Sequence, residues 1–508
     1  GITRYPVSGD APKSTFIRSV RSNPVRVTAE RPGRRLFWGD LHGHTQNSDG
    51  TGTVDHYYEY ARRASNLDFA AVSDHVGAGL SERTWSRFQR AAREFNDPGS
   101  FVTFLGCEWS TSKWGDRNVY FLRTDRPNPV PRGTMRELWG SIGDARALVI
   151  PHHTAYPVGL RGADWRIHND RYQRLVEIAS CHGLSEYYGN PGECGGIRSN
   201  MGPAAPGGFA RDGLERGVKV GFIASSDDHS GRPGSAQWRK WGDGHSSPVA
   251  GVWASDLERK PLFEAMSRRR TCGTTGARMI LRFRMDGHWM GQEYATGEPP
   301  TAHVYVAGTA PIKRVVIVKN GREAHVVEPD GMEAEFEWTD PDFDEPHAWY
   351  YVRVEQTDRE WGWTSPVWVN STDPFPDLAV ELPEISIAEK RRTGGDMDVP
   401  LMVRNVGNAP ARGGQVRVTH GRVSSAWPSE NPAKGGTLGT MSGVGLQVWR
   451  WSVSEDRVNV FIRWADRENA SRFTGSVKVI GARDYTVRRY HWEGDDEFSD
   501  DHDGSLEF

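Results

Sequence analysis

Short apolar runs separated by polar, helix-like stretches dominate the chain from residue 35 to about residue 284. Each run is four to seven residues long, is rich in Val, Ile, Phe and Ala, and mostly lacks strict alternation. Such runs are typical of parallel strands that are buried on both faces. The seven runs are LFWG (36–39), LDFAAVS (67–73), FVTFLG (101–106), ALVI (147–150), LVEIAS (175–180), VGFIAS (220–225) and VAGVWAS (249–255).

A helical pattern lies between the first two runs. In TVDHYYEYARRA (53–64), Thr53 can cap a helix, and Tyr57, Ala61 and Ala64 recur at helical spacing. Strands that alternate with helices imply βαβ units. The pattern therefore predicts an α/β region over residues 36–285, built on a parallel sheet or barrel.

The pattern changes after about residue 285, where β-branched and aromatic residues alternate or cluster between Gly, Pro and Asp turns. The spacing of these segments is typical of a β-sandwich. We predict a β-sandwich domain over residues 286–376 that packs on the preceding domain, because little flexible linker separates them. A second β-rich domain is predicted over residues 377–492. Residues 1–35 are predicted to be an extended segment, and residues 493–508 a solvated acidic tail.

Composition excludes several classes of protein. At 508 residues, the chain is long enough for about three domains, and 37% hydrophobic residues can build sizeable cores. The 63 Lys and Arg nearly balance the 66 Asp and Glu, so a globally basic nucleic-acid binder is not expected. No run of 18 apolar residues is present, so no membrane span is predicted. We expect a soluble multidomain protein, and the sequence leaves its oligomeric state open.

The cysteines and the N-terminus say little about the compartment. Four cysteines without metal-motif spacing are too few to stabilise a chain of this size through disulfides, and Cys107 and Cys181 are predicted to be reduced core residues. The N-terminus, GITRYPVSGD, has no signal pattern but is compatible with a processed end. An exported location therefore stays open.

Metal-compatible side chains follow six of the seven apolar runs directly. Because the carboxyl ends of parallel strands converge on one face, we expect these side chains to form one cluster. Strand side chains alternate faces, so His42 and His44 point the same way, Asp227 and His229 do too, and Asp228 points away. The candidates are His42, His44, His75, Glu108, His152, His153, His182, Asp227 and His229, with Asp49 able to reach back from its loop.

Ten candidate ligands are too many for one metal ion, because a tetrahedral zinc site takes four. The set fits two or three divalent ions bridged by Glu108. Mixed imidazole and carboxylate ligands favour Zn, Mn or Fe over Mg or Ca. His152 and His153 cannot both point inward from an ideal strand, and both stay candidates.

The order of these motifs resembles that of the PHP (polymerase and histidinol phosphatase) superfamily, in particular its large members with a C-terminal β-domain. The resemblance rests on FWGDLHGHTQNSDG, AVSDH, GCEWS, PHHTA and SSDDHSG, covers about residues 35–285, and extends to RRRTCGTTGARMILRFRMDG (268–287). It implies a distorted (β/α)7 TIM-like barrel with a trinuclear metal site, followed by C-terminal β-sandwich-like domains. The ligands it implies are His42, His44, Asp49, His75, Glu108, one of His152 and His153, Asp227 and His229. His182 has the least support, because ASCHGLSE departs from the pattern of small family members.

The expected function is a metal-dependent hydrolase, and most specifically a phosphoesterase that cleaves a small-molecule mono- or diester with a metal-activated hydroxide. Asp74 is predicted to orient a ligand or water, or to protonate the leaving group. Arg232, in the loop DDHSGRPG, could clamp a phosphate oxygen, although a solvated loop arginine is the alternative. Weaker candidates for substrate binding are Arg198, Lys113 and Tyr156.

Two other functions stay open on the sequence. The same hydroxide could attack a non-phosphate ester, a lactone or an amide. Alternatively, the protein could be a glycan-binding protein with an inert barrel, because its 20 Trp residues suit sugar binding as well as β-rich cores.

Overall fold

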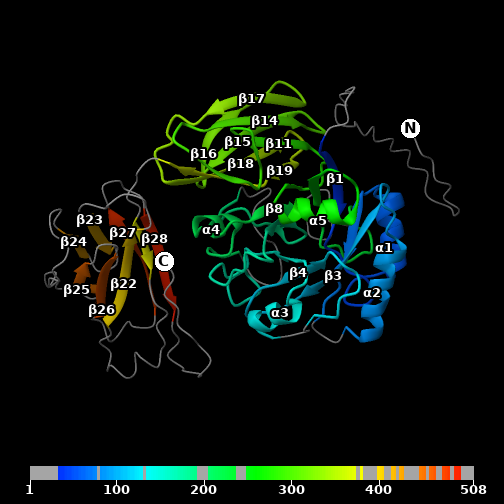
Figure 1. The fold of residues 1–508 in the computed structure, drawn as a ribbon, viewed down its shortest axis with the longest axis horizontal. Coiled ribbons are helices and arrows are strands. Elements are labelled where there is room, and N and C mark those ends of the chain that lie inside the picture. Colours follow the sequence, from blue (N-terminus) through cyan, green and yellow to red (C-terminus); the bar gives the residue numbers. More distant parts are fainter. Residues whose placement is uncertain are drawn as a thin grey trace. The chain divides into compact units, whose positions relative to one another are not determined.

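The computed structural model describes residues 33–76, 80–129, 133–190, 204–235 and 247–372, together with the backbone of eight strands between residues 378 and 493 (Figure 1). The predicted extended segment and the predicted acidic tail lie almost entirely outside the described residues, as does Arg198. Among the described residues, no helix has both the length and the apolar character needed to cross a membrane.

The chain divides into two compact units. The first comprises Gly1–Phe343 and Ala348–Asn370, and the second comprises Asp344–His347 and Ser371–Phe508. The candidate site lies in the first unit.

All seven predicted apolar runs form strands, and almost every residue in these strands is buried. The predicted helix over residues 53–64 is also confirmed, as a short α-helix, α1 (Val54–Glu59), continued by a π-helical turn, η1 (Tyr60–Ala64). Thr53 caps α1 by accepting the backbone N–H of His56 at 3.1 Å. The strands are β1 (Arg35–Asp40), β2 (Phe69–Val72), β3 (Val102–Trp109), β5 (Ala147–Pro151), β6 (Leu175–Ser180), β8 (Gly221–Ala224) and β9 (Val249–Ala254).

The predicted (β/α)7 barrel is wrong. The protein is mostly β-sheet, and its largest sheet is mixed, with parallel pairing between β1 and β2 and between β2 and β3. In the same sheet, β9 runs antiparallel to β1, and β4 (Arg117–Phe121) runs antiparallel to both β3 and β5. The parallel pair β6 and β8 belongs to a separate three-stranded sheet with β7 (Gly183–Leu184).

The connections explain why the barrel prediction failed. A parallel crossover needs a dozen or more residues, usually including a helix. Only seven residues, 110–116, join β3 to β4, so the chain turns back and pairs antiparallel. Helices are short and few in the described part of the chain: besides α1, they are α2 (Glu82–Glu94), α3 (Met135–Ile142), α4 (Ala210–Glu215) and α5 (Arg259–Ser267). Apolar runs thus predicted burial correctly, but they did not specify strand direction.

Strands from both sides of residue 285, where a domain boundary is predicted, are hydrogen-bonded in one sheet. The link is β10 (Thr271–Thr274), which pairs with β9 on one side and with β19 (Trp361–Thr364) on the other. The large sheet also contains β13 (Glu293–Thr296), β15 (Ile312–Lys319), β16 (Arg322–Val327), β18 (His347–Gln356) and β20 (Val367–Ser371). A four-stranded sheet is formed by β11 (Ile280–Met285), β12 (His288–Trp289), β14 (Thr301–Ala307) and β17 (Glu333–Thr339).

The second unit contains two four-stranded antiparallel sheets, an arrangement typical of a β-sandwich. One sheet is ordered β21 (Leu378–Glu381), β22 (Asp398–Asn405), β26 (Arg457–Trp464) and β25 (Leu446–Val453). The other is ordered β24 (Val423–Trp427), β23 (Gly414–Val418), β27 (Arg472–Ile480) and β28 (Thr486–Glu493).

A buried carboxylate ties the segment after β7 to strands β18 and β19. The Glu186 side chain is fully buried, and its Oε1 accepts Arg353 Nη1 at 2.9 Å and the Tyr351 hydroxyl. Its Oε2 accepts Trp363 Nε1 at 2.7 Å. Every donor that reaches the Glu186 carboxylate is itself buried, so the cluster fixes one packing of this segment against the sheet.

Glu186→Ala is expected to lower the free energy of unfolding by about 3–5 kcal/mol, because the buried donors of Tyr351, Arg353 and Trp363 lose their acceptor together, although Arg353 keeps its ion pair with Glu323. Denaturant unfolding followed by Trp fluorescence measures the change. The exposed Glu335 in β17 serves as a control, since Glu335→Ala is expected to cost less than about 0.5 kcal/mol. Equal losses in the two variants would contradict the assigned role of Glu186.

Candidate metal centre

Eleven His, Asp and Glu side chains come together where several strands of the first unit end. Their ligand atoms form five overlapping groups, and within each group these atoms lie within 4.8 Å of one another. All ten predicted ligands belong to these groups, and Glu177 in β6 is the eleventh member. The groups are His44–Asp49–His75–His229, His42–His44–Glu108, His42–His152–Glu177, Glu108–His152–His153 and His153–His182–Asp227.

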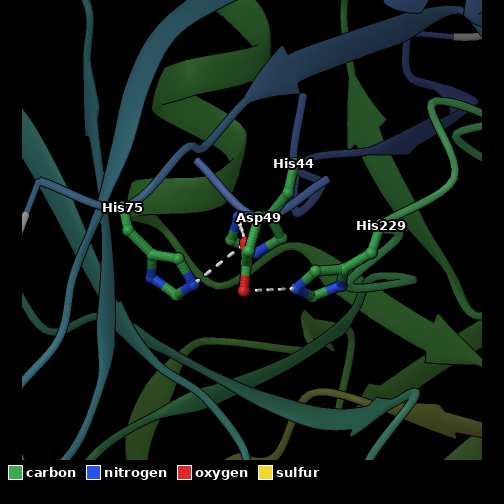
Figure 2. Close-up of side chains that lie close together, drawn as sticks. All are labelled: His44, Asp49, His75 and His229. Atoms are coloured by element: carbon green, nitrogen blue, oxygen red, sulfur yellow. Dashed lines mark ion pairs between the residues drawn. The ribbon is translucent and has the colours of Figure 1, made fainter. Parts of the chain in front are cut away.

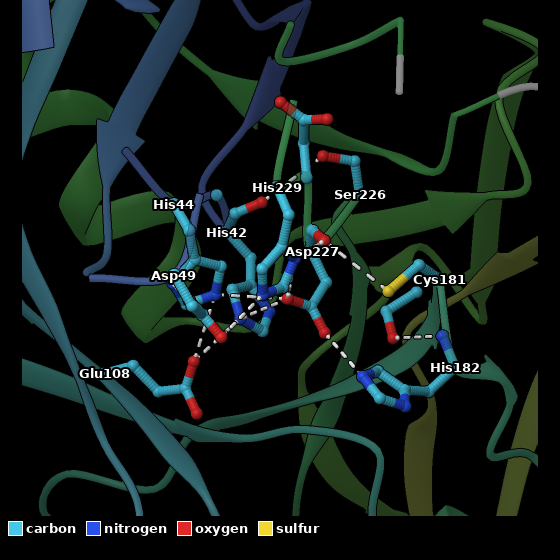
Figure 3. Close-up of polar contacts among 12 residues, drawn as sticks. His42, His44, Asp49, Glu108, Cys181, His182, Ser226, Asp227 and His229 are labelled. Atoms are coloured by element: carbon cyan, nitrogen blue, oxygen red, sulfur yellow. Dashed lines mark hydrogen bonds and ion pairs between the residues drawn. The ribbon is translucent and has the colours of Figure 1, made fainter. Parts of the chain in front are cut away.

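Glu108, near the end of β3, lies between four imidazoles. Its Oε2 is 3.2 Å from both His42 Nε2 and His44 Nε2 (Figure 3). Its Oε1 is 3.3 Å from His75 Nδ1 and 3.5 Å from His152 Nε2. Burial raises the pKa of the Glu108 carboxyl, but the surrounding imidazoles outweigh burial and hold this pKa well below its usual range. Glu108 is therefore a charged carboxylate whose two oxygens face different pairs of histidines.

Asp227, after β8, is the second carboxylate at the centre. Its Oδ1 lies 3.2 Å from His42 Nε2 and 3.1 Å from His44 Nε2, and its Oδ2 lies 3.1 Å from His182 Nε2 (Figure 3). The Asp227 backbone has φ +55°, in the left-handed region that few non-glycine residues adopt. Such conformations persist only where the surrounding structure enforces them, and they cluster at functional sites.

Asp49 reaches the cluster from the loop after His44, as its position in the sequence predicts. Its Oδ1 lies 3.4 Å from His75 Nε2 and 3.7 Å from His44 Nδ1, and its Oδ2 lies 3.4 Å from His229 Nε2 (Figure 2). The Asp49 side chain is 57% exposed, whereas the His44 side chain is fully buried. This group therefore forms the solvent-facing edge of the cluster.

In several histidines of the cluster, one ring nitrogen contacts a neighbouring side chain that can fix the orientation of the ring. Both carboxylate oxygens of Glu177 lie 3.2 Å from His42 Nδ1, and the Tyr156 hydroxyl lies 2.8 Å from His182 Nδ1. His153 Nε2 lies 3.4 Å from Asp116 Oδ2. Partners of this kind fix the tautomer and the orientation of metal-binding histidines.

The donor set fits divalent metal ions. His152 is buried, and neither of its ring nitrogens has a hydrogen-bond partner in the part of the chain that the structure describes. Burial and the neighbouring His42 and His153 hold the pKa of His152 well below its usual value, so the ring is neutral. A buried, neutral imidazole without a hydrogen bond, beside charged carboxylates, is a suitable ligand for Zn, Mn or Fe.

Asp74 and Asp228 neighbour candidate ligands in the sequence, but their carboxylates form hydrogen bonds with loop residues. Asp74 is buried and accepts the backbone N–H of Thr45 at 2.8 Å, the Thr45 hydroxyl at 2.7 Å and the Ser48 hydroxyl at 2.5 Å. It thereby holds the loop that carries Asp49. Asp228 accepts the Ser230 backbone N–H at 2.9 Å and the backbone N–H of Arg232, so it turns away from the cluster as the strand alternation predicts.

The candidate substrate-binding residues occupy different surroundings. The Arg232 side chain is exposed, and the Lys113 side chain is exposed with its Nζ 5.0 Å from the centre of the Trp114 ring. Tyr156 is fully buried and its hydroxyl contacts His182. It therefore orients a candidate ligand and is not accessible to solvent.

Sequence reasoning missed several buried charged groups. Glu177 lies inside the apolar run LVEIAS, where a carboxylate in a buried strand was the available signal. Asp40 ends β1 and accepts the backbone N–H of Ser226 at 3.0 Å and of Gly234 at 2.7 Å; burial raises its pKa to about 6. Asp116 follows no apolar run, so no sequence pattern pointed to it.

Tyr156→Phe is expected to lower metal affinity or turnover by about 10–100-fold, because it removes the hydroxyl that orients His182. The expected change in thermal stability is small, since the ring stays in place. Metal titration measures the affinity for metal, and steady-state assays measure turnover. Tyr60→Phe, at a half-buried Tyr in η1, is the matched control and should leave both unchanged. If the two variants behave alike, the hydroxyl does not position His182.

Comparison with known sequences finds relatives of unknown function. A family model described as a protein of unknown function (DUF3604) matches residues 53–161 and 232–311. The matched residues include the candidate ligands His75, Glu108, His152 and His153. An uncharacterised protein of Chlamydia muridarum is 28% identical over 402 residues, and one of Chlamydia trachomatis serovar D is 27% identical over 403 residues. Each match covers 73% of this chain and 62% of the relative, so the chain spans less than two thirds of these relatives.

Comparison with solved structures finds distant likenesses. One is a two-domain protein from Bacteroides vulgatus that contains a predicted PHP-like metal-dependent phosphoesterase, at 12% identity and a TM-score of 0.35, covering 93% of this chain and 98% of that one. Another comprises fibronectin(III)-like modules of CbhA from Clostridium thermocellum, at 11% identity and a TM-score of 0.14, covering 43% of this chain and 99% of that one. Scores this low do not establish a shared fold. The chain is similar to these proteins, and the sequence relatives are described without a named activity.

Proposed function

We propose that this protein is a metal-dependent hydrolase, and specifically a phosphoesterase that cleaves small-molecule mono- or diesters. In this proposal the cluster holds two or three divalent ions of Zn, Mn or Fe. The ligands are His42, His44, Asp49, His75, Glu108, His152, His153, His182, Asp227 and His229, with Glu177 as a further ligand or as the partner that orients His42.

The position of Glu108 carries the proposal. Its Oε2 faces the pair His42 and His44, while its Oε1 faces His75 and His152. A carboxylate placed between separate sets of imidazoles would help to hold more than one ion. A single tetrahedral ion would leave more than half of these side chains without a role.

The metal ions, when bound, would supply hydroxide at neutral pH and would stabilise the negative charge on the phosphoryl oxygens. The residues of the chain perform the remaining steps. Arg232, exposed in the loop after the last ligands, binds a phosphoryl oxygen through its guanidinium. Glu177 and Tyr156 keep the rings of His42 and His182 in place, and Asp74 keeps the Asp49 loop in place. Asp74 is therefore assigned a positioning role, since its oxygens are occupied by Thr45 and Ser48.

The test combines metal analysis with a substrate panel. Elemental analysis of gently purified protein is expected to find two or three ions per chain. Hydrolysis of p-nitrophenyl phosphate and bis-p-nitrophenyl phosphate should be lost after chelation and restored by Mn²⁺ or Zn²⁺.

The outcomes separate the proposal from its alternatives. A metal-loaded protein that hydrolyses lactones, amides or carboxylic esters, and releases no alcohol or phosphate from phosphoesters, would replace the phosphoesterase by another hydrolase. A protein that takes up no Zn²⁺, Mn²⁺ or Fe²⁺ would overturn the metal centre itself.

A further inference from the structure

Five arginines gather on the first unit around two tryptophans and one tyrosine. The guanidinium carbons of Arg34 and Arg284 lie 5.1 Å and 4.5 Å from the centre of the same ring, Trp289. Arg282 lies two residues from Arg284 on the same face of β11, 5.4 Å from the ring centres of both Trp253 and Tyr305. We call Arg34, Arg268, Arg270, Arg282 and Arg284 the arginine cluster.

Arg270 lies beside Trp253, because its backbone carbonyl accepts the Trp253 backbone N–H at 2.9 Å, and Arg268 and Arg34 lie close enough to Arg270 for their charges to interact with it. Burial, together with the charges of Arg34 and Arg268, lowers the pKa of Arg270 to about 10. Burial also lowers the pKa of Arg284, and Arg282 and Arg34 add to that effect. Four of the five arginines come from RRR (268–270) and RFR (282–284), which lie within a sequence motif that the proposed hydrolysis does not use.

Among the residues that the structure describes, no carboxylate forms an ion pair with the arginine cluster. Within the described ranges, none of the five arginines forms an ion pair or donates a side-chain hydrogen bond, and the buried Nε atoms of Arg270 and Arg284 have no partner. Like charges at this spacing repel one another, so the cluster costs free energy unless an anion binds. A guanidinium held over an aromatic ring keeps its N–H donors for other groups, because the ring face accepts none of them as a conventional hydrogen bond.

The arginine cluster is separate from the metal centre. Arg34 precedes β1 and His42 follows it, and a six-residue strand is about 20 Å long. A ligand group held by the arginine cluster therefore cannot be the one that reacts at the metal centre.

We propose that the arginine cluster is a binding site for a ligand that carries several phosphate or sulfate groups. Guanidinium groups bind tetrahedral oxyanions through paired N–H donors, and several neighbouring arginines match several oxyanions on one ligand. Trp253 and Trp289 are only 4% and 9% exposed, and arginines lie over their rings. Their faces are therefore closed to stacked bases or sugars, and recognition depends on the charged groups of the ligand.

Calorimetric titration with inorganic tripolyphosphate tests the proposal on the full chain. A chelator is kept present, so the metal centre cannot bind the probe and the result does not depend on the proposed hydrolysis. The parent protein is expected to bind tripolyphosphate, more weakly as salt is added. The R282Q/R284Q variant is expected to bind at least tenfold more weakly, and R268Q/R270Q tests the other side of the cluster should the first variant fail to fold. A parallel titration with heparin distinguishes a sulfated polymer from a phosphate ligand.

The matched control removes two exposed arginines from other elements, Arg136 of α3 and Arg322 of β16. R136Q/R322Q has the same net charge as R282Q/R284Q, so it should bind like the parent if the cluster is the site. Arginine-dependent binding of either probe supports the proposal and identifies the oxyanion. The proposal is overturned if the parent binds neither probe, or if the control variant loses as much affinity as R282Q/R284Q.

Discussion

Replacing Glu108 by Gln is expected to reduce phosphoester turnover by more than about 100-fold. This loss exceeds the roughly 10–100-fold expected when a residue that only orients a metal ligand is replaced. The reason is that Glu108 places one oxygen against His42 and His44 and the other against His75 and His152. Glutamine keeps the size of the side chain but loses the charge, and its amide nitrogen cannot bind a metal ion.

Elemental analysis and steady-state assays of Glu108→Gln measure the two consequences together. The expected result is the loss of at least one ion per chain along with the loss of turnover. Glu335→Gln, on the exposed edge of β17, should retain both metal and activity. Full metal content with normal turnover in Glu108→Gln would mean that this carboxylate is not a bridging ligand.

The candidate site was predictable from the sequence because its residues follow buried strands. Each apolar run marked a strand, and the first polar residues after it marked the strand's end, as His42 and His44 do after β1. That reasoning needs only strand ends that lie close together, and the ends of β1, β2, β3 and β5 in one sheet and of β6 and β8 in another do so. The predicted side chains therefore come together, although the closed barrel is wrong.

The fold was less predictable because burial does not encode strand direction. β2 and β5 look alike in sequence, since both are short, apolar and buried throughout. Yet β2 has parallel neighbours on both sides, whereas β5 pairs antiparallel with β4. The difference depends on the lengths of the connections and on where the chain turns back, which hydrophobic patterning does not record.

Residues that act through another residue were the hardest to find. Asp116 is buried with its Oδ2 2.7 Å from Arg161 Nε and 3.4 Å from His153 Nε2. Burial and the charge of Glu108 together raise the pKa of Asp116 to about 8, although the Arg161 charge opposes them. Neither Asp116 nor Arg161 belongs to a motif or directly follows an apolar run, because their contacts are made between two loops. Such contacts become visible only in three dimensions.

Asp227→Asn and Asp228→Asn are expected to separate chemistry from loop structure at adjacent positions. Asn tolerates the left-handed backbone of Asp227, so this substitution removes the charge with little strain. It removes the carboxylate that contacts His42, His44 and His182. Turnover should fall by more than about 100-fold, which is a larger loss than the roughly 10–100-fold expected when a residue that only orients a metal ligand is replaced. In Asp228→Asn, an amide NH₂ replaces one of the two acceptors that hold Ser230 and Arg232, which should cost about 1–3 kcal/mol of stability.

Assays at saturating Mn²⁺ or Zn²⁺, together with denaturant unfolding of the metal-free proteins, give the two readouts. Asp227→Asn should lose activity, and its metal-free stability should also fall, because His42, His44 and His182 outweigh burial, hold the pKa of Asp227 well below its usual range and so favour the charged carboxylate in the folded protein. Asp228→Asn should lose stability and keep turnover within a few-fold of the parent, provided that the assay temperature lies below its unfolding transition. The assignment fails if Asp228→Asn, still folded, loses as much turnover as Asp227→Asn, since Asp228 turns away from the cluster and its neighbour does not.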